Sequence, residues 1–154
     1  MGIIEIMSET DNKTLNKDKK KKDLGPPLKI LIADDTAVNL SLATKLLIRR
    51  GHDIIAVENG LQAFEAFKEG SFDVVLMDIH MPVMDGLEST AKIREYEASE
   101  TSRPPTAIIA MTANNEQSDH EIYLKSGMNG IITKPLDIKN VVSQIREIIT
   151  SFSS

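Results

Sequence analysis

The 154-residue sequence contains no cysteine, and aromatic residues make up only 4% of it. The absence of cysteine excludes disulfide bonds, thiolate catalysis and thiolate metal sites. No apolar run approaches the roughly 20 residues that span a bilayer, and the first seven residues lack the basic region of a signal peptide. The net charge of −5 argues against a nucleic-acid-binding surface. These absences predict a protein of the cytoplasm, with the nucleus as the alternative, and with neither membrane nor nucleic acid as a partner.

The sequence has the composition of one ordinary globular domain preceded by an arm. Hydrophobic residues make up 41% and charged residues 27% of the chain, as is typical of globular proteins. Residues 1–27 differ, because they are polar, rich in lysine and end in Gly25-Pro26-Pro27. We interpret them as a disordered basic arm, whose lysine run leaves open a nuclear-import or acidic-partner patch. The folded domain is predicted to cover residues 28–154.

From residue 28 onward, short apolar runs alternate five times with helical patterns. Short β-branched runs are typical of buried parallel strands, and five units are too few for a closed barrel of about 250 residues. The pattern therefore predicts an α/β, flavodoxin-like (βα)5 fold, a doubly wound five-stranded parallel sheet of order 2-1-3-4-5. The expected strands are 29–33, 53–57, 74–78, 107–111 and 130–133. The expected helices are 38–50 (with Leu42, Leu46, Leu47 and Ile48 as its apolar stripe), 61–68, 87–97, 116–126 and one that begins after Asp137 as its N-cap.

Four of the expected strands end at residues that can bind a metal or a phosphate: Asp34-Asp35, Asp78, Thr112 and Lys134. Because ligands of open parallel sheets bind outside the carboxyl ends of the strands, these side chains are expected to converge at one edge. Three neighbouring carboxylates repel each other unless a cation lies among them, and Mg²⁺ prefers oxygen ligands of this kind. Taken alone, the acidic pair could equally well cap the following helix.

The same residues suit the transfer of a phosphoryl group. Lys134 offers a positive charge for a phosphate oxygen, and Thr112 offers a hydroxyl donor. No Walker glycine loop (GxxxxGK) occurs, so the chain shows no means of holding a nucleotide. A carboxylate at the end of a central strand can itself attack phosphorus and form an acyl phosphate. Asp78 is the best-placed acceptor, because it ends the expected middle strand.

Taken together, these motifs resemble those of a response-regulator receiver domain. The likeness extends from Leu28 to about Phe152 and is carried by Asp34-Asp35, Leu76-Met77-Asp78-Ile79-His80-Met81-Pro82-Val83-Met84-Asp85-Gly86, Met111-Thr112-Ala113 and Thr133-Lys134-Pro135. It implies that Asp78 is the phosphoryl acceptor and that Asp34, Asp35, Asp78 and the backbone carbonyl of His80 hold Mg²⁺. It also implies that Lys134 pairs with the phosphoryl group, that Thr112 is the switch hydroxyl, and that the Lys134–Pro135 peptide bond is cis.

Asn39, the Met-Pro-Val-Met-Asp-Gly loop and Thr112-Ala113-Asn114 are similar to the receivers of hybrid histidine kinases and their phosphorelays. The resemblance implies a histidine-phosphotransfer protein or a histidine kinase as partner, and a monomer or weak homodimer. Ile131 stands where many receivers carry Tyr or Phe, which favours relay of the phosphoryl group over a conformational output. The docking face implied by the resemblance consists of Ala37, Val38, Leu40 and Leu42 where exposed, with Pro135 and Leu136.

Two other functions remain open from the sequence. An aspartyl-phosphate hydrolase of the haloacid dehalogenase kind needs two aspartates one residue apart at a strand end, whereas Asp78-Ile79-His80 lacks the second acid. An inactive pseudo-receiver would serve only as a binding module, and the presence of every acidic position and of Lys134 counts against it. We therefore expect a phosphoryl acceptor rather than a turnover enzyme. The Asp85-Gly86 pair is interpreted as a turn.

Overall fold

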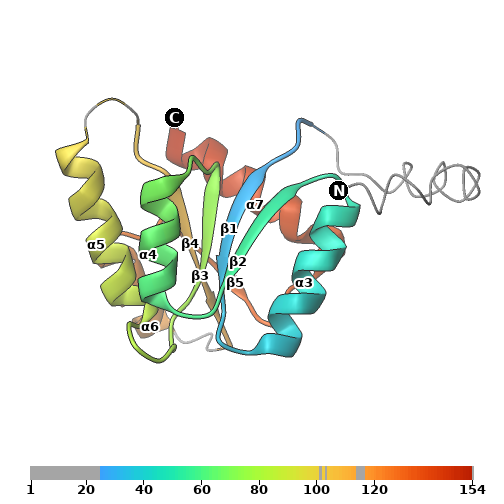
Figure 1. Cartoon of the computed structure of the whole chain (residues 1–154), viewed down its shortest axis with the longest axis horizontal. Coiled ribbons are helices and arrows are strands. Elements are labelled where there is room, and N and C mark those ends of the chain that lie inside the picture. Colours follow the sequence, from blue (N-terminus) through green and yellow to red (C-terminus); the bar gives the residue numbers. More distant parts are fainter. Residues whose placement is uncertain (1–24, 101, 103, 114–116, 154) are drawn as a thin grey trace, which may run out of the picture.

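The computed structural model describes residues 25–153, except 101, 103 and 114–116. Five strands alternate with five helices in this part of the chain. They are labelled here as in Figure 1. The elements are β1 (Lys29–Ala33), α3 (Ala37–Arg49), β2 (Asp53–Val57), α4 (Gly60–Glu69), β3 (Val74–Asp78), α5 (Gly86–Ser99), β4 (Ala107–Thr112), α6 (Gln117–Lys125), β5 (Gly130–Thr133) and α7 (Ile138–Ser153).

The strands form one parallel sheet of order β2-β1-β3-β4-β5, which confirms the predicted fold. The three central strands are almost wholly buried, whereas β2 is an edge strand with exposed positions such as Ile55. Central strands buried on both faces must be apolar on both, which explains their unbroken β-branched runs. None of the described helices is long and apolar enough to cross a membrane.

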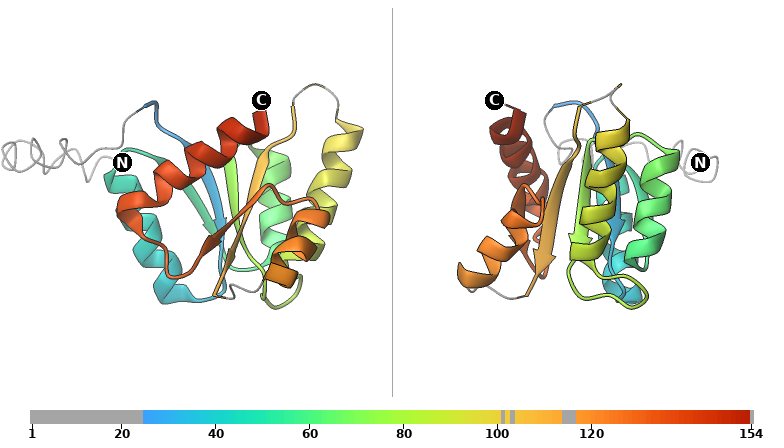
Figure 2. Two further views of the ribbon diagram at one scale, coloured as in Figure 1. Left: turned by 180° about the vertical axis from the view of Figure 1, so that it is seen from behind. Right: turned by 90° about the vertical axis from the view of Figure 1, so that its left-hand side faces the viewer.

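Helices cover both faces of the sheet, so the protein has two cores. On one face, α3 and α7 pack on β1, β3 and β4 through residues such as Leu47 and Ile145. On the other face, α4, α5 and α6 contribute Phe67, Ile93 and Tyr123. Figure 2 shows α7 on one side of the sheet and α4 and α5 on the other. This two-sided packing covers the faces of the central strands and leaves their carboxyl ends open to ligands.

The predicted ends of the elements hold to within a few residues. Gly51 and Gly127, which directly follow the expected helices 38–50 and 116–126, have the positive φ angles of 104° and 112° that favour glycine at helix ends. Asp137 accepts a hydrogen bond from the N–H of Lys139 over 3.2 Å, as expected for the N-cap of α7. The Lys134–Pro135 peptide bond is cis, as the resemblance implied.

The predicted apolar stripe of the first helix was right for Leu47, which is buried, but wrong for Leu42 and Ile48, which are exposed. The buried residues of α3 are Leu40, Ala43 and Leu47, while Leu42 is 57% exposed. The helix carries leucine or isoleucine around most of its circumference, so its period alone does not decide which face meets the sheet. The face with the small Ala43 lies against the sheet, and the leucine-rich alternative is left partly in solvent.

Candidate functional site

The ends of the strands bring the predicted site residues to one edge of the sheet. Because β1 and β4 lie on either side of β3, the residues that follow β1 lie beside Asp78 at the end of β3. On the other side, Thr112 ends β4 and pairs with Thr133 of β5. The backbone N–H of Lys134 then donates to the carbonyl oxygen of Thr112 over 2.8 Å. The order of the strands is therefore sufficient to collect these residues.

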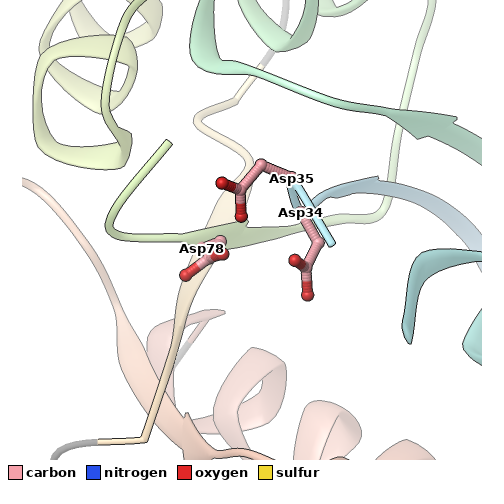
Figure 3. A group of neighbouring side chains, drawn as sticks. All are labelled: Asp34, Asp35 and Asp78. Atoms are coloured by element: carbon pink, nitrogen blue, oxygen red, sulfur yellow. The ribbon is translucent and has the colours of Figure 1, made fainter. Parts of the chain in front are cut away.

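Asp34, Asp35 and Asp78 form a compact carboxylate cluster (Figure 3). One oxygen of each lies within 4.8 Å of the others. Asp34 and Asp78 are buried, at 4% and 5% exposure, whereas Asp35 is open to solvent. The donors are all oxygen atoms, and the open side at Asp35 leaves room for the water ligands that Mg²⁺ retains in proteins. This donor set fits a hard divalent cation.

Lys134 reaches the two buried acids of the cluster. Its Nζ lies 3.2 Å from Oδ2 of Asp78 and 3.5 Å from Oδ2 of Asp34. One ammonium group cannot neutralise three carboxylates, so the cluster keeps an excess of negative charge. The site can therefore bind a metal cation while Lys134 stays paired with Asp34 and Asp78.

Burial raises the pKa of the Asp78 carboxyl above its ordinary value. The loss of water around the charged form is the largest cause, and it outweighs the charge and hydrogen bond of Lys134, which lower the pKa. The neighbouring carboxylate of Asp34 raises the pKa further, and a hydrogen bond from the Ile79 backbone lowers it. A cation among the acids would favour the ionised form of Asp78, which is also its nucleophilic form.

Backbone groups hold Asp34 in place. Its Oδ1 accepts a hydrogen bond from the N–H of Thr36 over 2.9 Å, and its own N–H donates to the carbonyl of Val57 over 3.1 Å. The N-cap of α3 is Thr36, and its own side chain makes no capping hydrogen bond. Neither acid is therefore the N-cap residue, although Asp34 binds the backbone N–H of Thr36 at the start of the helix.

Thr112 and His80 lie near the acceptor for different reasons: Thr112 follows Met111, which pairs with Asp78 across the sheet, and His80 follows Asp78 by two residues. Thr112 is buried at the end of β4, at 4% exposure. His80 lies in the loop directly after β3, and its side chain is exposed. The roles implied for them, a switch hydroxyl and a backbone ligand for the metal, remain predictions.

Two glycines that the sequence patterns did not assign to the site shape the loop after β3. A Cβ atom at Gly86 would collide with the carbonyl oxygen of Asp78, and one at Gly60 with that of Met84. The interpretation of Asp85-Gly86 as a turn captured only part of this, because Asp85 is the N-cap of α5 and accepts from the N–H of Glu88 over 2.8 Å. An Asp-Gly pair signals a chain reversal, but not which backbone it approaches.

A small cavity of about 150 Å³ adjoins the acidic cluster and shares Asp34 and Lys134 with it. The cavity lies between α3 and the chain that follows β5, and its walls are mainly apolar. The other residues that line it are Ile32, Asn39, Leu42, Ala43, Leu46, Pro135, Leu136 and Ile138.

Comparison with known proteins identifies the family. A model described as "Response regulator receiver domain" matches residues 30–146. Hybrid signal transduction histidine kinase I of Dictyostelium discoideum is 42% identical over 118 residues, which cover 73% of this chain but only 7% of the kinase. The chain thus spans only a small part of the length of such a relative.

Solved structures agree with this result. The receiver domain of sensor histidine kinase PA1611 from Pseudomonas aeruginosa, described with a magnesium ion in its active-site cleft, has a TM-score of 0.69 and 31% identity over 81% of this chain and 99% of its own. A chain from the co-crystal of the Saccharomyces cerevisiae proteins Ypd1, a histidine phosphotransfer protein, and the receiver domain of Ssk1 has a TM-score of 0.76 and 30% identity, over 81% and 90%. The protein is thus a doubly wound α/β domain with the strand order of receiver domains. It belongs to the response regulator receiver family, whose members are phosphoacceptors.

Proposed function

We propose that the chain is a phosphorelay receiver in which Asp78 accepts a phosphoryl group from a phosphohistidine. The donor is a histidine-phosphotransfer protein or a histidine kinase. The observation that supports this proposal is the convergence of three carboxylates and Lys134 around the end of the central strand β3. This arrangement suits an acceptor better than a binding module, because a bare acidic cluster at a buried strand end would be costly without a cation or phosphoryl ligand.

In the proposed step, a carboxylate oxygen of Asp78 forms a bond to phosphorus. The bond from phosphorus to the partner's imidazole nitrogen breaks, and its electron pair leaves with the imidazole. Lys134, whose Nζ is already 3.2 Å from Asp78, pairs with one phosphoryl oxygen, and the Thr112 hydroxyl donates to another. These two residues stabilise the charge that accumulates on the phosphoryl oxygens during transfer.

Asp34, Asp35, Asp78 and the backbone carbonyl of His80 would hold Mg²⁺, which supplies the positive charge that an incoming phosphoryl group needs beside three acids. We expect Mg²⁺ to stabilise the fold by about 1.4 kcal/mol when its concentration is about ten times its dissociation constant. That corresponds to a rise in melting temperature of about 3–6 °C. Thermal unfolding followed by circular dichroism, with and without Mg²⁺, measures it.

Asp35→Asn should weaken Mg²⁺ binding by at least about tenfold, because it removes the solvent-open carboxylate of the set. Asp53→Asn is the matched control, since Asp53 begins β2 and pairs with Lys29. Both residues lie at the amino ends of their strands, away from the carboxylate cluster at the carboxyl ends. A Mg²⁺-dependent shift that is the same in both variants would contradict the proposed ligand set.

The proposed docking face lies on α3 and on the chain after β5. Val38 and Leu42 are 75% and 57% exposed, and Ala37 and Pro135 are also exposed. Leu40 must be removed from the predicted face, because it is 8% exposed and packs in the core. The similarity to a receiver solved together with Ypd1 supports a phosphotransfer protein as the partner class.

Other parts of the proposal concern the whole chain. Ile131, in place of an aromatic residue, supports relay of the phosphoryl group as the output. We further propose that the chain acts as a monomer or weak homodimer in the cytoplasm or nucleus, without a nucleic-acid or membrane partner. The proposed arm, residues 1–27, lies largely outside the described residues, and the proposed domain covers 28–154.

Transfer of labelled phosphate tests the proposal directly. The chain is mixed with Mg²⁺ and either phosphorylated Ypd1 or phosphoramidate, a small molecule with the same phosphorus–nitrogen bond. We expect base-labile label on the chain, as for an acyl phosphate, and no labelling when EDTA removes Mg²⁺. No labelling from either donor would support the pseudo-receiver instead. Continuous release of phosphate from an unrelated phosphomonoester would support the hydrolase.

A further inference from the structure

Ser89 places a hydroxyl group in a fully buried position of α5. The side chain has 0% exposure, and its Oγ donates to the carbonyl of Gly60 at the start of α4 over 2.7 Å. A serine within a helix can instead bond to the carbonyl four residues earlier, whereas this one reaches a different element. Burying a hydroxyl costs free energy that an alanine in the same place would not incur. Packing alone therefore does not explain a serine at this position.

The hydroxyl closes a ring of hydrogen bonds between α4, α5 and the loop after β3. The N–H of Gly60 donates to the carbonyl of Met84 over 2.9 Å. The N–H of Ser89 donates to the carbonyl of Asp85 over 3.0 Å, and Met84 and Asp85 are joined by a peptide bond. A Cβ atom at Gly60 would collide with both of these carbonyl oxygens, so the two backbones are in direct contact. Figures 1 and 2 show α4 and α5 side by side on one face of the sheet.

The ring leads to the acceptor through Gly86, the first residue of α5. The N–H of Gly86 donates to the carbonyl of Ile79 over 2.8 Å, and Gly86 also lies against the carbonyl oxygen of Asp78. Ile79 in turn gives a backbone hydrogen bond to the Asp78 carboxylate, which favours its ionised form. His80, whose carbonyl is a proposed magnesium ligand, is the next residue. The position of the ring is therefore passed on to the acceptor and to the metal site.

The loop that the ring holds is strained. The φ angle of Val83 is 70°, which is an outlier for a β-branched residue. The N–H of Met84 donates to the carbonyl of Pro82 over 2.6 Å and closes a tight turn around it. Strained backbone persists only where the surrounding contacts over-determine it. If the ring opens, the loop can relax, and the backbone of Ile79 and His80 moves with it.

Thr90, the next residue of α5, is buried in the same way but bonded differently. Its exposure is also 0%, yet its Oγ1 has no hydrogen-bond partner in the part of the chain that the structure describes. Burial of a hydroxyl on α5 therefore does not by itself create a bond to another element. The bond from Ser89 to Gly60 is a separate feature, and Thr90 provides a natural control for it.

We propose that Ser89 is a positioning residue for phosphoryl transfer, because its hydrogen bond to Gly60 fixes the loop after β3 and the backbone beside the acceptor. This inference rests on the proposed function and adds a residue to it. Ser89 acts through the ring and through Gly86 on the orientation of the Ile79 and His80 peptide groups. Loss of its hydroxyl should therefore weaken Mg²⁺ binding and slow transfer while the fold remains intact.

Two substitutions separate positioning from the burial of a hydroxyl. Ser89→Ala removes a hydroxyl that is hydrogen-bonded, and Thr90→Val replaces one that is not by a methyl group of similar size. We expect Ser89→Ala to raise the Mg²⁺ dissociation constant by about threefold or more, measured by titration of backbone amide signals in NMR spectra. Labelling by phosphoramidate at saturating Mg²⁺ should slow by about fivefold or more, at a temperature where the variant is fully folded. Thr90→Val should change both quantities by less than about 1.5-fold.

Ser89→Thr is the rescue variant, because it keeps the donor but adds a methyl group to a filled space. We expect it to lower the melting temperature and yet to bind Mg²⁺ within about twofold of the unmodified chain. A purely structural role would instead make Mg²⁺ affinity follow the melting temperature. Hydrogen exchange at the Gly86 amide reports on the loop without any chemistry. It should be faster by about tenfold in Ser89→Ala than in Thr90→Val.

The possible failures are distinguishable. Equal Mg²⁺ affinity and equal labelling in Ser89→Ala and Thr90→Val would overturn the inference, as would unchanged exchange at the Gly86 amide. A loss of Mg²⁺ affinity in Ser89→Thr as large as that in Ser89→Ala would also overturn it, since the hydroxyl would then not be the cause. Failure of the unmodified chain to bind Mg²⁺ or to be labelled would instead overturn the proposed function, and with it the role of Ser89 in transfer.

Discussion

Asp78→Asn is expected to lower the rate of phosphorylation by at least about 10³-fold. The loss should be the same with phosphorylated Ypd1 and with phosphoramidate as the donor. The amide oxygen of asparagine is a poor nucleophile, and the neighbouring Asp34 is already engaged by the N–H of Thr36 and by Lys134. Incorporated phosphate, located by mass spectrometry of proteolytic peptides, measures the effect. Asp53→Asn at the opposite edge of the sheet should be labelled normally. Label that persists on Asp78→Asn would show that another residue is the acceptor.

The same variant should remain well folded, which separates loss of chemistry from loss of structure. The pKa of Asp78 is raised in the folded state, chiefly by burial. Such a group contributes stability that is complete below its unfolded pKa and is lost as pH rises through the folded pKa. Above the folded pKa this contribution is absent, so Asp78→Asn should there be at least as stable as the unmodified chain without Mg²⁺. The difference in stability between Asp78→Asn and the unmodified chain should shrink as the pH falls and the Asp78 carboxyl takes up a proton.

The position of the site could be predicted because it depends on topology more than on detail. The run that ends at Asp78 is buried along its whole length, and short apolar runs of this kind identify parallel strands locally. Parallel strands joined by right-handed crossovers place all their carboxyl ends at one edge. An error of one or two residues in a helix boundary does not change this result, and for that reason the acidic pair and Lys134 were placed together correctly.

Other features of the site could not be predicted, because they depend on which surfaces meet in space. The burial of Leu40 and the exposure of Leu42 follow from the rotation of α3 on the sheet, and its leucines allow more than one rotation. The positive φ of Val83 has no local signal, because valine avoids that conformation. The raised pKa of Asp78 depends on burial and on the distances to Lys134 and Asp34, which the sequence does not contain.

Gly86→Ala is expected to destabilise the fold by about 2–4 kcal/mol. The new methyl group would collide with the carbonyl oxygen of Asp78 and would also press on the side chain of Met77. A backbone carbonyl at the end of a buried strand cannot move aside without shifting β3 or the start of α5. Urea unfolding followed by circular dichroism gives the change in the free energy of unfolding. Gly70→Ala is the matched control, because its nearest neighbour is the flexible ring of Phe72 at 3.2 Å, and it should change stability by less than about 1 kcal/mol.

The substitution should also slow phosphorylation in the molecules that remain folded. Displacing the acceptor by about 1 Å can lower a rate by about 10²-fold, so labelling by phosphoramidate should fall even under conditions where Gly86→Ala is fully native. Gly60→Ala provides the comparison, since its methyl group would collide with the Met84 carbonyl in the loop and not with Asp78. Both alanine variants should be destabilised, but Gly86→Ala should lose more of the rate. If Gly86→Ala is as stable and as reactive as Gly70→Ala, the loop after β3 does not set the position of the acceptor carboxylate.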